Sequence, residues 1–468
     1  MRSTPSRRLA AVRSLNTARG LTACGLALCG FAASSPAAAQ DDWLTFVDVT
    51  STRLVGAASI GSADIEEKDL ISGDVDRDGD IDMLVARKTP FSNPGGRRNV
   101  LFMNENVVFT HRTSTLAPHL LDATDDRDIG LVDVDRDGWL DIVTITTFSE
   151  QPRLYMNLGE IGGVWQGFDW NPSDNRLPTF SPAPKFCALA VGDVDGVNGP
   201  DIIMIDYDND LEDRLLINDG TGVFTDETSS RMTSEMSESV FGTDAAIVDL
   251  DRDGDLDILK VNSSGENPPP DASPSAVRAL YNDGTGNFDY FELIYAEQPY
   301  MIEVGDFDGN QRPDVFVVDD EQDSVMLNTG NGSDGRADFT QISITSSPNT
   351  FGFGGNTKIA DMDGDGMLDV LVADVDTDIA NCDDNNLVIL RGGGTAPNLT
   401  FTDPLNGELR FWNTRGTFDI EVLDWNNDGV PDIWAGTCTG TVLLEGVRAL
   451  FESRFEDGTT DEWDSAVP

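Results

Sequence analysis

Seven nine-residue segments of the chain place aspartates at alternating positions, a spacing that suits the binding of a hard cation. In the first segment, Asp74, Asp76, Asp78 and Asp82 stand at positions one, three, five and nine, and Gly79 stands at position six. Calcium takes about six to eight oxygen ligands from carboxylates, backbone carbonyls and water, and glycine permits a sharp turn. Four carboxylates gathered without an ion would repel one another. The segments therefore predict cation sites, with calcium as the ion.

The seven copies start 55 to 63 residues apart. We expect each copy to supply side-chain oxygens, together with the backbone carbonyl of position seven, to one ion. The candidate ligands are Asp74, Asp76, Asp78, Asp80 and Asp82; Asp133, Asp135, Asp137, Trp139 and Asp141; Asp193, Asp195 and Asp201; Asp249, Asp251, Asp253, Asp255 and Asp257; Asp306, Asp308, Asn310, Arg312 and Asp314; Asp361, Asp363, Asp365, Met367 and Asp369; and Asp424, Asn426, Asp428, Val430 and Asp432.

Three copies depart from the full pattern. The copy at Asp193 has Val197 at position five and depends on Asn198 or water for that ligand. The copy at Asp306 has Asn310 at position five and no glycine at position six, and the copy at Asp424 has Asn426 at position three. We therefore expect up to seven calcium sites, with the one at Asp193 the least complete.

Other interpretations of the segments are an EF-hand, a magnesium site and a plain acidic turn. An EF-hand loop needs Glu at position twelve. The residues found there are Val85, Thr144, Met204, Lys260, Val317, Val372 and Ala435, which excludes that motif. Magnesium demands a stricter octahedral geometry than seven all-protein cages suggest. An acidic turn without an ion remains the alternative for each copy.

Each segment stands between short runs of apolar and β-branched residues, such as 129–132 and 142–145. A third run follows, as at 215–218, and a glycine-rich turn leads into a fourth, as at 219–225. Runs of this kind separated by Gly and Asp predict short strands. Four strands in each period are typical of one blade of a β-propeller. The acidic segment is then the loop between the first and second strands.

The last period contains only three of these strands, ending near residue 444. Residues 44–51 resemble the fourth-strand segment 223–229, although they stand before the first period. We expect this N-terminal strand to complete the seventh blade, because it would remove an open sheet edge. The predicted fold is all-β, a seven-bladed β-propeller over residues 40–446.

The phased Asp-x-Asp-x-Asp-Gly-x-x-Asp loops resemble the FG-GAP and VCBS repeats of the integrin alpha-chain N-terminal propeller and of many secreted bacterial proteins. The stretch Phe351-Gly352-Phe353-Gly354-Gly355 looks like the FG-GAP signature itself. The similarity covers about residues 43–446. It implies a calcium-loop propeller that acts as an adhesion or ligand-binding module, with the ligand on the face opposite the calcium loops.

The two ends of the chain differ from the repeats. Arginines precede an apolar stretch at 21–33, and small residues continue to Ala39. This order is typical of a secretory signal peptide, so we expect residues 1–39 to be cleaved near Ala39 and the protein to be secreted to the medium, the cell surface or the periplasm. Residues 447–468 form a C-terminal tail without an assigned role. Cys187 is expected to be a buried thiol, and a Cys382–Cys438 disulfide is left open.

Charge narrows the range of partners. The 468 residues include 83 Asp and Glu against 31 Lys and Arg, a formal net charge of −52. Nucleic acid is therefore excluded, because phosphate binding needs clustered basic residues. No apolar run beyond the signal is long enough to span a membrane. We expect a monomer with a protein or glycan ligand.

The competing hypothesis is a carbohydrate-active enzyme, similar to a polysaccharide lyase, with a basic cluster of Arg87, Lys88, Arg97 and Arg98 expected together in one loop. Neither His111 nor His119 lies beside a Ser or Cys nucleophile in the sequence, so no catalytic triad is indicated. We assign no catalytic residue and no organic cofactor. The acidic loops between second and third strands are expected to be solvated, with further cations or a basic partner as the alternatives.

Overall fold

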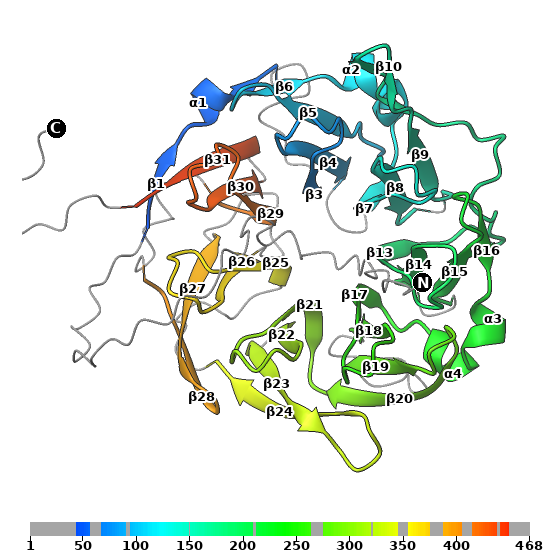
Figure 1. The fold of residues 1–468 in the computed structure, drawn as a ribbon, viewed down its shortest axis with the longest axis vertical. Helices are drawn as coiled ribbons and strands as arrows, with labels where there is room; N and C mark the ends of the chain where they lie inside the picture. The colour runs from blue at the N-terminus through cyan, green and yellow to red at the C-terminus, as the bar shows by residue number, and fades with distance from the viewer. Residues whose placement is uncertain are drawn as a thin grey trace, which may run out of the picture.

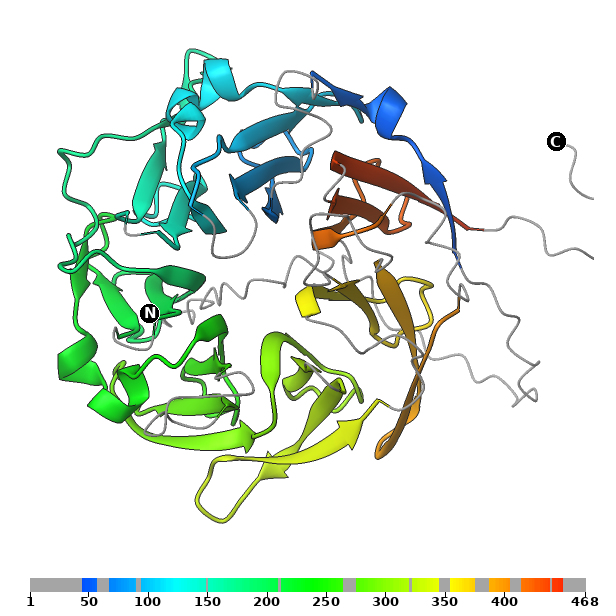
Figure 2. The same cartoon turned by 180° about the vertical axis from the view of Figure 1, so that it is seen from behind.

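The computed structural model describes residues 44–56, 67–89, 94–148, 150–208, 212–263, 275–319, 322–344, 354–374, 387–404, 414–437 and 440–448. Over these residues, seven antiparallel sheets follow one another around a ring with a central axis (Figure 1, and from behind in Figure 2). This arrangement confirms the predicted seven-bladed propeller.

Each blade contains four strands, which follow the chain from the axis to the rim in blades 1 to 6, whereas the outermost strand of blade 7 comes from the N-terminus. Blade 1 has β3 (Glu67–Gly73), β4 (Asp82–Lys88), β5 (Val100–Asn104) and β6 (Phe109–His111); blade 2 has β7 (Asp126–Val132), β8 (Asp141–Thr146), β9 (Arg153–Asn157) and β12 (Phe168–Asp169); blade 3 has β13 (Phe186–Gly192), β14 (Asp201–Asp206), β15 (Arg214–Asn218) and β16 (Phe224–Asp226); blade 4 has β17 (Gly242–Val248), β18 (Asp257–Asn262), β19 (Ala276–Asn282) and β20 (Phe288–Tyr295). Blade 5 has β21 (Pro299–Gly305), β22 (Asp314–Asp319), β23 (Ser324–Asn331) and β24 (Ala337–Ser343); blade 6 has β25 (Gly354–Ala360), β26 (Asp369–Asp374), β27 (Val388–Thr395) and β28 (Asn398–Thr402); blade 7 has β29 (Thr417–Leu423), β30 (Asp432–Thr437), β31 (Gly440–Val447) and β1 (Thr45–Asp48).

The remaining elements are short and lie at the rim. They are α1 (Thr50–Arg53), β2 (Leu54–Val55), β10 (Glu160–Ile161), β11 (Val164–Trp165), α2 (Thr113–Leu116), η2 (Pro118–Leu121), α3 (Thr228–Arg231) and α4 (Ser234–Ser237). Among the residues that the structure describes, no helix is long and apolar enough to cross a membrane.

The N-terminal strand closes the ring as the sequence predicts. β1 pairs antiparallel with β31, from Thr45 opposite Val447 to Asp48 opposite Leu444. The chain then continues through α1 into β2, which pairs in parallel with β6 of blade 1. One N-terminal segment therefore joins blade 7 to blade 1 across the seam (Figure 1).

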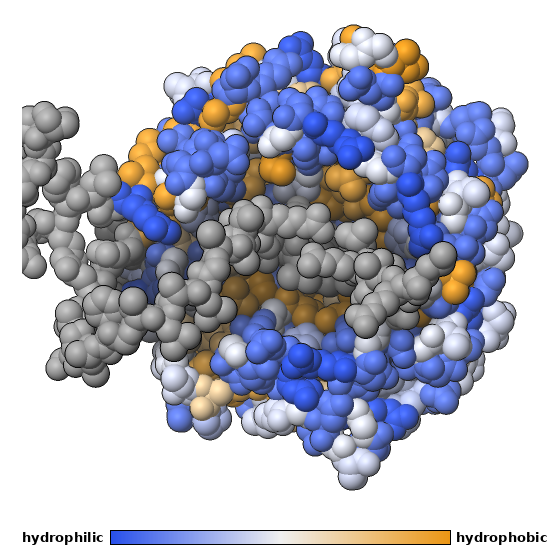
Figure 3. Space-filling view, in the orientation of Figure 1, coloured by the Kyte–Doolittle hydropathy of each residue, from blue (hydrophilic) through white to orange (hydrophobic). Residues whose placement is uncertain are grey.

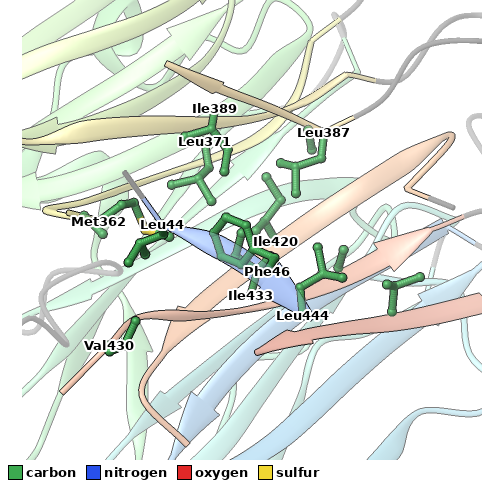
Figure 4. Close-up of a cluster of buried hydrophobic side chains, with 14 residues drawn as sticks. Leu44, Phe46, Met362, Leu371, Leu387, Ile389, Ile420, Val430, Ile433 and Leu444 are labelled. Atoms are coloured by element: carbon green, nitrogen blue, oxygen red, sulfur yellow. The ribbon is translucent and has the colours of Figure 1, made fainter. Parts of the chain in front are cut away.

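Apolar side chains fill the spaces between neighbouring blades. Leu44, just before β1, and Phe46 of β1 are buried against Ile433 and Leu444 of blade 7 and Leu371 of blade 6 (Figure 4). Strands with both faces covered need continuous apolar runs, which explains the unbroken β-branched stretches of the sequence. Hydrophilic residues cover most of the rim, and hydrophobic residues gather on the inner wall of the central hollow (Figure 3).

Aspartates on the innermost strands join several blades through hydrogen bonds to backbone amides. Asp69 Oδ2 accepts from Ile129 N at 2.9 Å, and Asp128 Oδ2 accepts from Leu189 N at 2.8 Å. Equivalent bonds run from Leu70 N to Asp419 Oδ2 and from Ile302 N to Asp244 Oδ2. These carboxylates are buried. Part of the excess of acidic residues therefore stabilises the contacts between neighbouring blades.

Candidate metal centres

All seven acidic loops connect the first and second strands of their blades, as predicted. In the loop of blade 2, Asp133 Oδ2 accepts from Gly138 N at 2.9 Å, Asp135 Oδ1 accepts from Asp137 N at 3.3 Å, and Asp137 Oδ1 accepts from Trp139 N at 2.9 Å. The side chains at positions one, three and five therefore fold the loop by capping its own amides. The same three bonds recur in the loops that begin at Asp74, Asp249, Asp306, Asp361 and Asp424.

Position one also carries an oxygen without a protein partner. The Oδ1 atom is buried and makes no hydrogen bond within the described residues in five loops, at Asp74, Asp133, Asp193, Asp249 and Asp306. A buried carboxylate oxygen left unpaired is costly. Burial also raises the pKa of four of these carboxyls, Asp74, Asp133, Asp193 and Asp249, from the usual value. A cation beside each oxygen would supply the missing partner.

The loops bring several oxygens to one place. Groups of three carboxylates whose ligand atoms lie within 4.8 Å of one another occur at Asp74, Asp76 and Asp78; Asp133, Asp135 and Asp141; Asp193, Asp195 and Asp201; Asp249, Asp251 and Asp257; and Asp306, Asp308 and Asp314. All residues of these five clusters are among the ligands predicted from the sequence. The donor set is oxygen throughout, which fits a hard cation.

Left-handed backbone recurs at positions four and six of the loops. The sequence indicated only position six, through its glycine. Gly79 at position six has φ +99°, and Gln311 takes φ +64° at the same position, so the loop at Asp306 makes the turn without glycine. Position four is also left-handed, for example at Arg77 (φ +61°) and Gly309 (φ +74°). The glycines at position four in three copies were the available signal for this second turn.

The aspartate at position nine has a structural role beyond that of a ligand. In blade 2, Asp141 Oδ2 accepts from Val134 N at 3.1 Å and Asp141 Oδ1 accepts from Asn157 N at 2.8 Å. The carboxylate therefore ties the loop and the third strand to the start of the second strand. Both bonds recur in every blade. Each oxygen keeps a second lone pair for an ion.

Burial perturbs these seven carboxyls strongly. It raises the pKa of Asp82, Asp257 and Asp432 to about 8, and that of Asp141, Asp201, Asp314 and Asp369 to about 7. Neighbouring loop carboxylates add to the rise, whereas the two backbone amides lower the pKa. A cation would favour the charged form and reverse this shift.

Asparagines outside the predicted ligand set link five of the seven loops to the next blade. Asn218, at the end of β15, donates from Nδ2 to Val134 O in the loop of blade 2 at 2.8 Å. Four further asparagines, Asn104, Asn157, Asn282 and Asn328, make the same bond to the preceding blade. The Asn that recurs at or near the end of the apolar third strand in five blades was the sequence signal. In blades 6 and 7, Gly392 and Gly446 stand at this position.

Arginines distinguish two of the loops from the others. In the loop of blade 6, Arg391 Nη2 lies 2.5 Å from Asp363 Oδ2 and 3.6 Å from Asp365 Oδ2. In the loop of blade 3, Arg231 Nη2 lies 3.2 Å from Asp195 Oδ2. A guanidinium therefore neutralises carboxylates in these loops, including the blade 6 loop whose sequence pattern is complete.

Other predicted features have mixed outcomes. Arg87 and Lys88 are buried on β4 instead of lying in a loop, and Arg87 Nη1 donates to Arg98 O. The acidic loops opposite the metal loops were wrongly expected to be solvated throughout: Asp206, Asp213, Asp319 and Asp323 are buried. Their oxygens accept backbone amides, and Asp213 also bonds to buried Lys260, because these loops need internal acceptors.

Cys187 is buried on β13, as predicted. The signal segment 1–39, most of the C-terminal tail, Cys382, Cys438 and the residues 351–353 of the FG-GAP-like signature lie outside the described residues.

Seven four-stranded blades around an axis, each with an acidic loop between its first two strands, define a β-propeller of repeated units. Residues 74–144 and 306–372 match the FG-GAP-like repeat. The chain therefore carries FG-GAP-like repeats on a seven-bladed propeller, in agreement with the resemblance seen in the sequence.

Comparison with individual proteins adds little beyond the fold. No curated protein sequence matches. Among solved structures, a lectin from Agrocybe aegerita that recognises non-reducing terminal N-acetylglucosamine aligns with TM-score 0.49 and 16% identity over 80% of this chain and 86% of the lectin. A thermostable family-43 glycoside hydrolase aligns with TM-score 0.36 and 13% identity over 60% of this chain and 93% of the hydrolase. At these scores neither neighbour carries an inference about the ligand.

Proposed function

We propose that the protein is a secreted, calcium-stabilised β-propeller that binds a protein or glycan ligand in adhesion and catalyses no reaction. The observation that carries the calcium assignment is the buried Oδ1 of the first aspartate in five loops, which has no partner among the residues that the structure describes. Calcium suits these loops better than magnesium, because it accepts irregular all-oxygen cages built from carboxylates and carbonyls.

In this proposal calcium acts mainly on stability. The ion would neutralise the carboxylates at positions one, three, five and nine and hold the loop between the first two strands. Position nine already connects that loop to the third strand through its hydrogen bonds. An ion in one loop would therefore stabilise three of the four strands of its blade.

Thermal unfolding of the mature protein with and without calcium tests the proposal. Removal of metal with a chelator should lower the melting temperature, and added calcium should restore it. Each site adds about 2.7 kcal/mol to the free energy of unfolding when free calcium is about 100 times its Kd. Magnesium at the same concentration should restore less. An unchanged melting curve after chelation would contradict the calcium assignment.

The ligand-binding role and the absence of catalysis are tested together. The mature protein is screened against glycan and protein arrays, and each bound glycan is then incubated with the protein and analysed for cleavage products. We expect binding without products. New reducing ends or unsaturated sugars would instead favour the lyase-like alternative.

A further inference from the structure

A groove opens at the rim of blade 2, where the outer strand of the sheet stops early. β12 pairs only with Met156 and Asn157 of β9, so it leaves the start of β9 uncovered. The connection to blade 3 runs along the outside of the ring instead (Figure 1). Between this connection and β9 lies a cavity of about 440 Å³, lined by residues 150–154, 156, 170–172 and 174–179. We call it the rim groove.

The outer wall of the rim groove is held at both ends. Gln151 Nε2 donates to Phe180 O at 3.2 Å, and Gln151 Oε1 accepts from Phe180 N at 2.8 Å. Further along the wall, Arg176 O accepts from Phe224 N, and Arg176 Nη1 donates to Thr221 O, both at 2.7 Å. The groove is therefore formed before any ligand arrives, which reduces the entropy lost on binding.

The lining combines an aromatic wall with polar groups. The guanidinium of Arg153 lies 4.4 Å from the centroid of the Trp170 ring, which fixes the orientation of the indole. Leu154, Met156 and Leu177 add apolar surface. A large apolar and aromatic wall with a few placed polar groups is typical of small-molecule sites.

Charges within the rim groove cancel. Its charged lining residues are two acids, Glu150 and Asp174, and two arginines, Arg153 and Arg176. A strongly charged ligand therefore gains little from the groove as a whole. In a chain with net charge −52, this neutral groove adds no attraction of its own for the cationic ligands that the rest of the surface would attract.

Two lining residues also carry unsatisfied hydrogen-bonding atoms. Glu150 Oε2, an acceptor, and Arg153 Nη1, a donor, are covered by their neighbours and have no hydrogen-bond partner among the described residues. Arg153 Nη1 lies 3.6 Å from Asp122 Oδ2, an ion pair that holds the guanidinium in place. A sugar hydroxyl both donates and accepts, so it can bond to the carboxylate of Glu150 or to the guanidinium of Arg153, which both line the groove.

We propose that the rim groove binds a neutral carbohydrate, with Trp170 packed against the apolar face of a sugar ring and Glu150 and Arg153 bonded to its hydroxyls. The volume falls within the range of about 300–1,000 Å³ that holds small ligands. The inference rests on the proposed ligand-binding function, to which it adds a site and a ligand class.

The experiment uses the full mature protein with calcium. Binding is measured by calorimetry for neutral oligosaccharides of glucose, mannose, xylose and N-acetylglucosamine, and for a glucuronate-containing oligosaccharide. Trp170→Ala should weaken binding of the best neutral sugar by about tenfold or more. The control is Tyr290→Ala, which removes another arginine-stacked surface aromatic, with Arg336 at 3.7 Å from its ring centroid. This control should leave affinity within about twofold, and melting curves verify that both variants fold.

A second variant tests the charge balance. Glu150→Gln gives the groove a net positive charge. The affinity for the glucuronate-containing oligosaccharide should therefore rise relative to the affinity for the best neutral sugar. Binding that survives Trp170→Ala, a native preference for the uronate, or no binding of any oligosaccharide would each overturn the groove assignment. The first two outcomes leave the proposed ligand-binding function intact, whereas loss of the calcium effect on melting would overturn the calcium assignment without affecting the groove.

Discussion

Individual side chains decide which acidic loops depend on an ion. The loops at Asp133 and Asp361 both carry four aspartates at the ligand positions. They differ because Arg391 places a guanidinium on Asp363 and Asp365, whereas Asp133 keeps a buried oxygen without a partner. Carboxylate count alone therefore does not fix the affinity of a loop for calcium.

Replacement of Arg391 tests this difference. In the Arg391→Ala variant, the blade 6 loop loses its internal cation, so we expect the protein to bind one more equivalent of calcium in equilibrium dialysis at limiting calcium. Without calcium the variant should unfold more easily, by about 1–3 kcal/mol, because Asp363 is left buried and unpaired. Arg336→Ala removes a guanidinium that pairs with Asp334 and stacks on Tyr290 instead of on a loop carboxylate, so it should leave the calcium count unchanged. An unchanged count for Arg391→Ala would show that the guanidinium does not compete with the ion.

At the scale of elements, the first three strands and the acidic loop of a blade form one unit. The aspartate at position nine bonds to the backbone of the loop and of the third strand. The asparagine at the end of the third strand then bonds to the loop of the preceding blade. Glycine replaces this asparagine in blades 6 and 7. The joints between blades 5 and 6 and between blades 6 and 7 therefore lack a bond that the other five joints have.

The asparagine link is tested by Asn218→Ala. Asn218 is buried, and its Nδ2 donates to Val134 O at 2.8 Å and to Pro200 O at 2.9 Å. Its loss leaves two carbonyls unsatisfied, so the free energy of unfolding should fall by about 1–3 kcal/mol in chemical denaturation.

Calcium affinity of the loop in the neighbouring blade 2 should weaken as well, because Val134 belongs to that loop. The matched control is Asn287→Ala, whose side-chain bonds stay within its own turn. It should change stability by less than about 0.5 kcal/mol. Equal effects of the two substitutions would contradict a link between blades.

At the scale of the whole molecule, the charge of −52 is distributed between the loops and the buried joints. The seven acidic loops hold 27 of the 83 acidic residues. Others, such as Asp69, Asp128, Asp213 and Asp319, are buried and bonded to backbone amides or to a lysine. Part of the acidity is therefore used inside the ring, at the joints between blades.

This distribution predicts how stability depends on pH. Without metal, burial raises the pKa of the seven aspartates at position nine to about 7 or 8, far above the value in the unfolded chain. The folded state then holds protons that the unfolded state releases. The stabilisation from these groups is complete below about pH 4 and is lost as the pH rises toward 8.

Calcium favours the charged carboxylates and should offset that loss. We expect the melting temperature of resin-stripped protein to fall from pH 5 to pH 8, and the gap between stripped and calcium-loaded protein to widen over the same range. Differential scanning calorimetry in matched buffers measures both. A gap that stays constant with pH would contradict the coupling between the ion and these carboxyls.

The sequence by itself determined the repeat, the blade and the closure, because these depend on local patterns. Strand runs, Gly and Asp turns and the phased aspartates recur often enough to define seven units, and the segment around Phe46 matches a fourth strand wherever it stands in the chain. The position-one aspartates were also predictable, since their spacing is a property of nine consecutive residues.

Only the tertiary structure decided what each carboxylate meets. Asp141 contacts Asn157, Arg391 reaches Asp363, and Asn218 reaches Val134 across a joint. These partners lie 16 to 84 residues apart. The rim groove likewise exists because β12 is short and a later connection covers β9. Such contacts depend on how blades pack around the ring, and sequence spacing alone does not specify that packing.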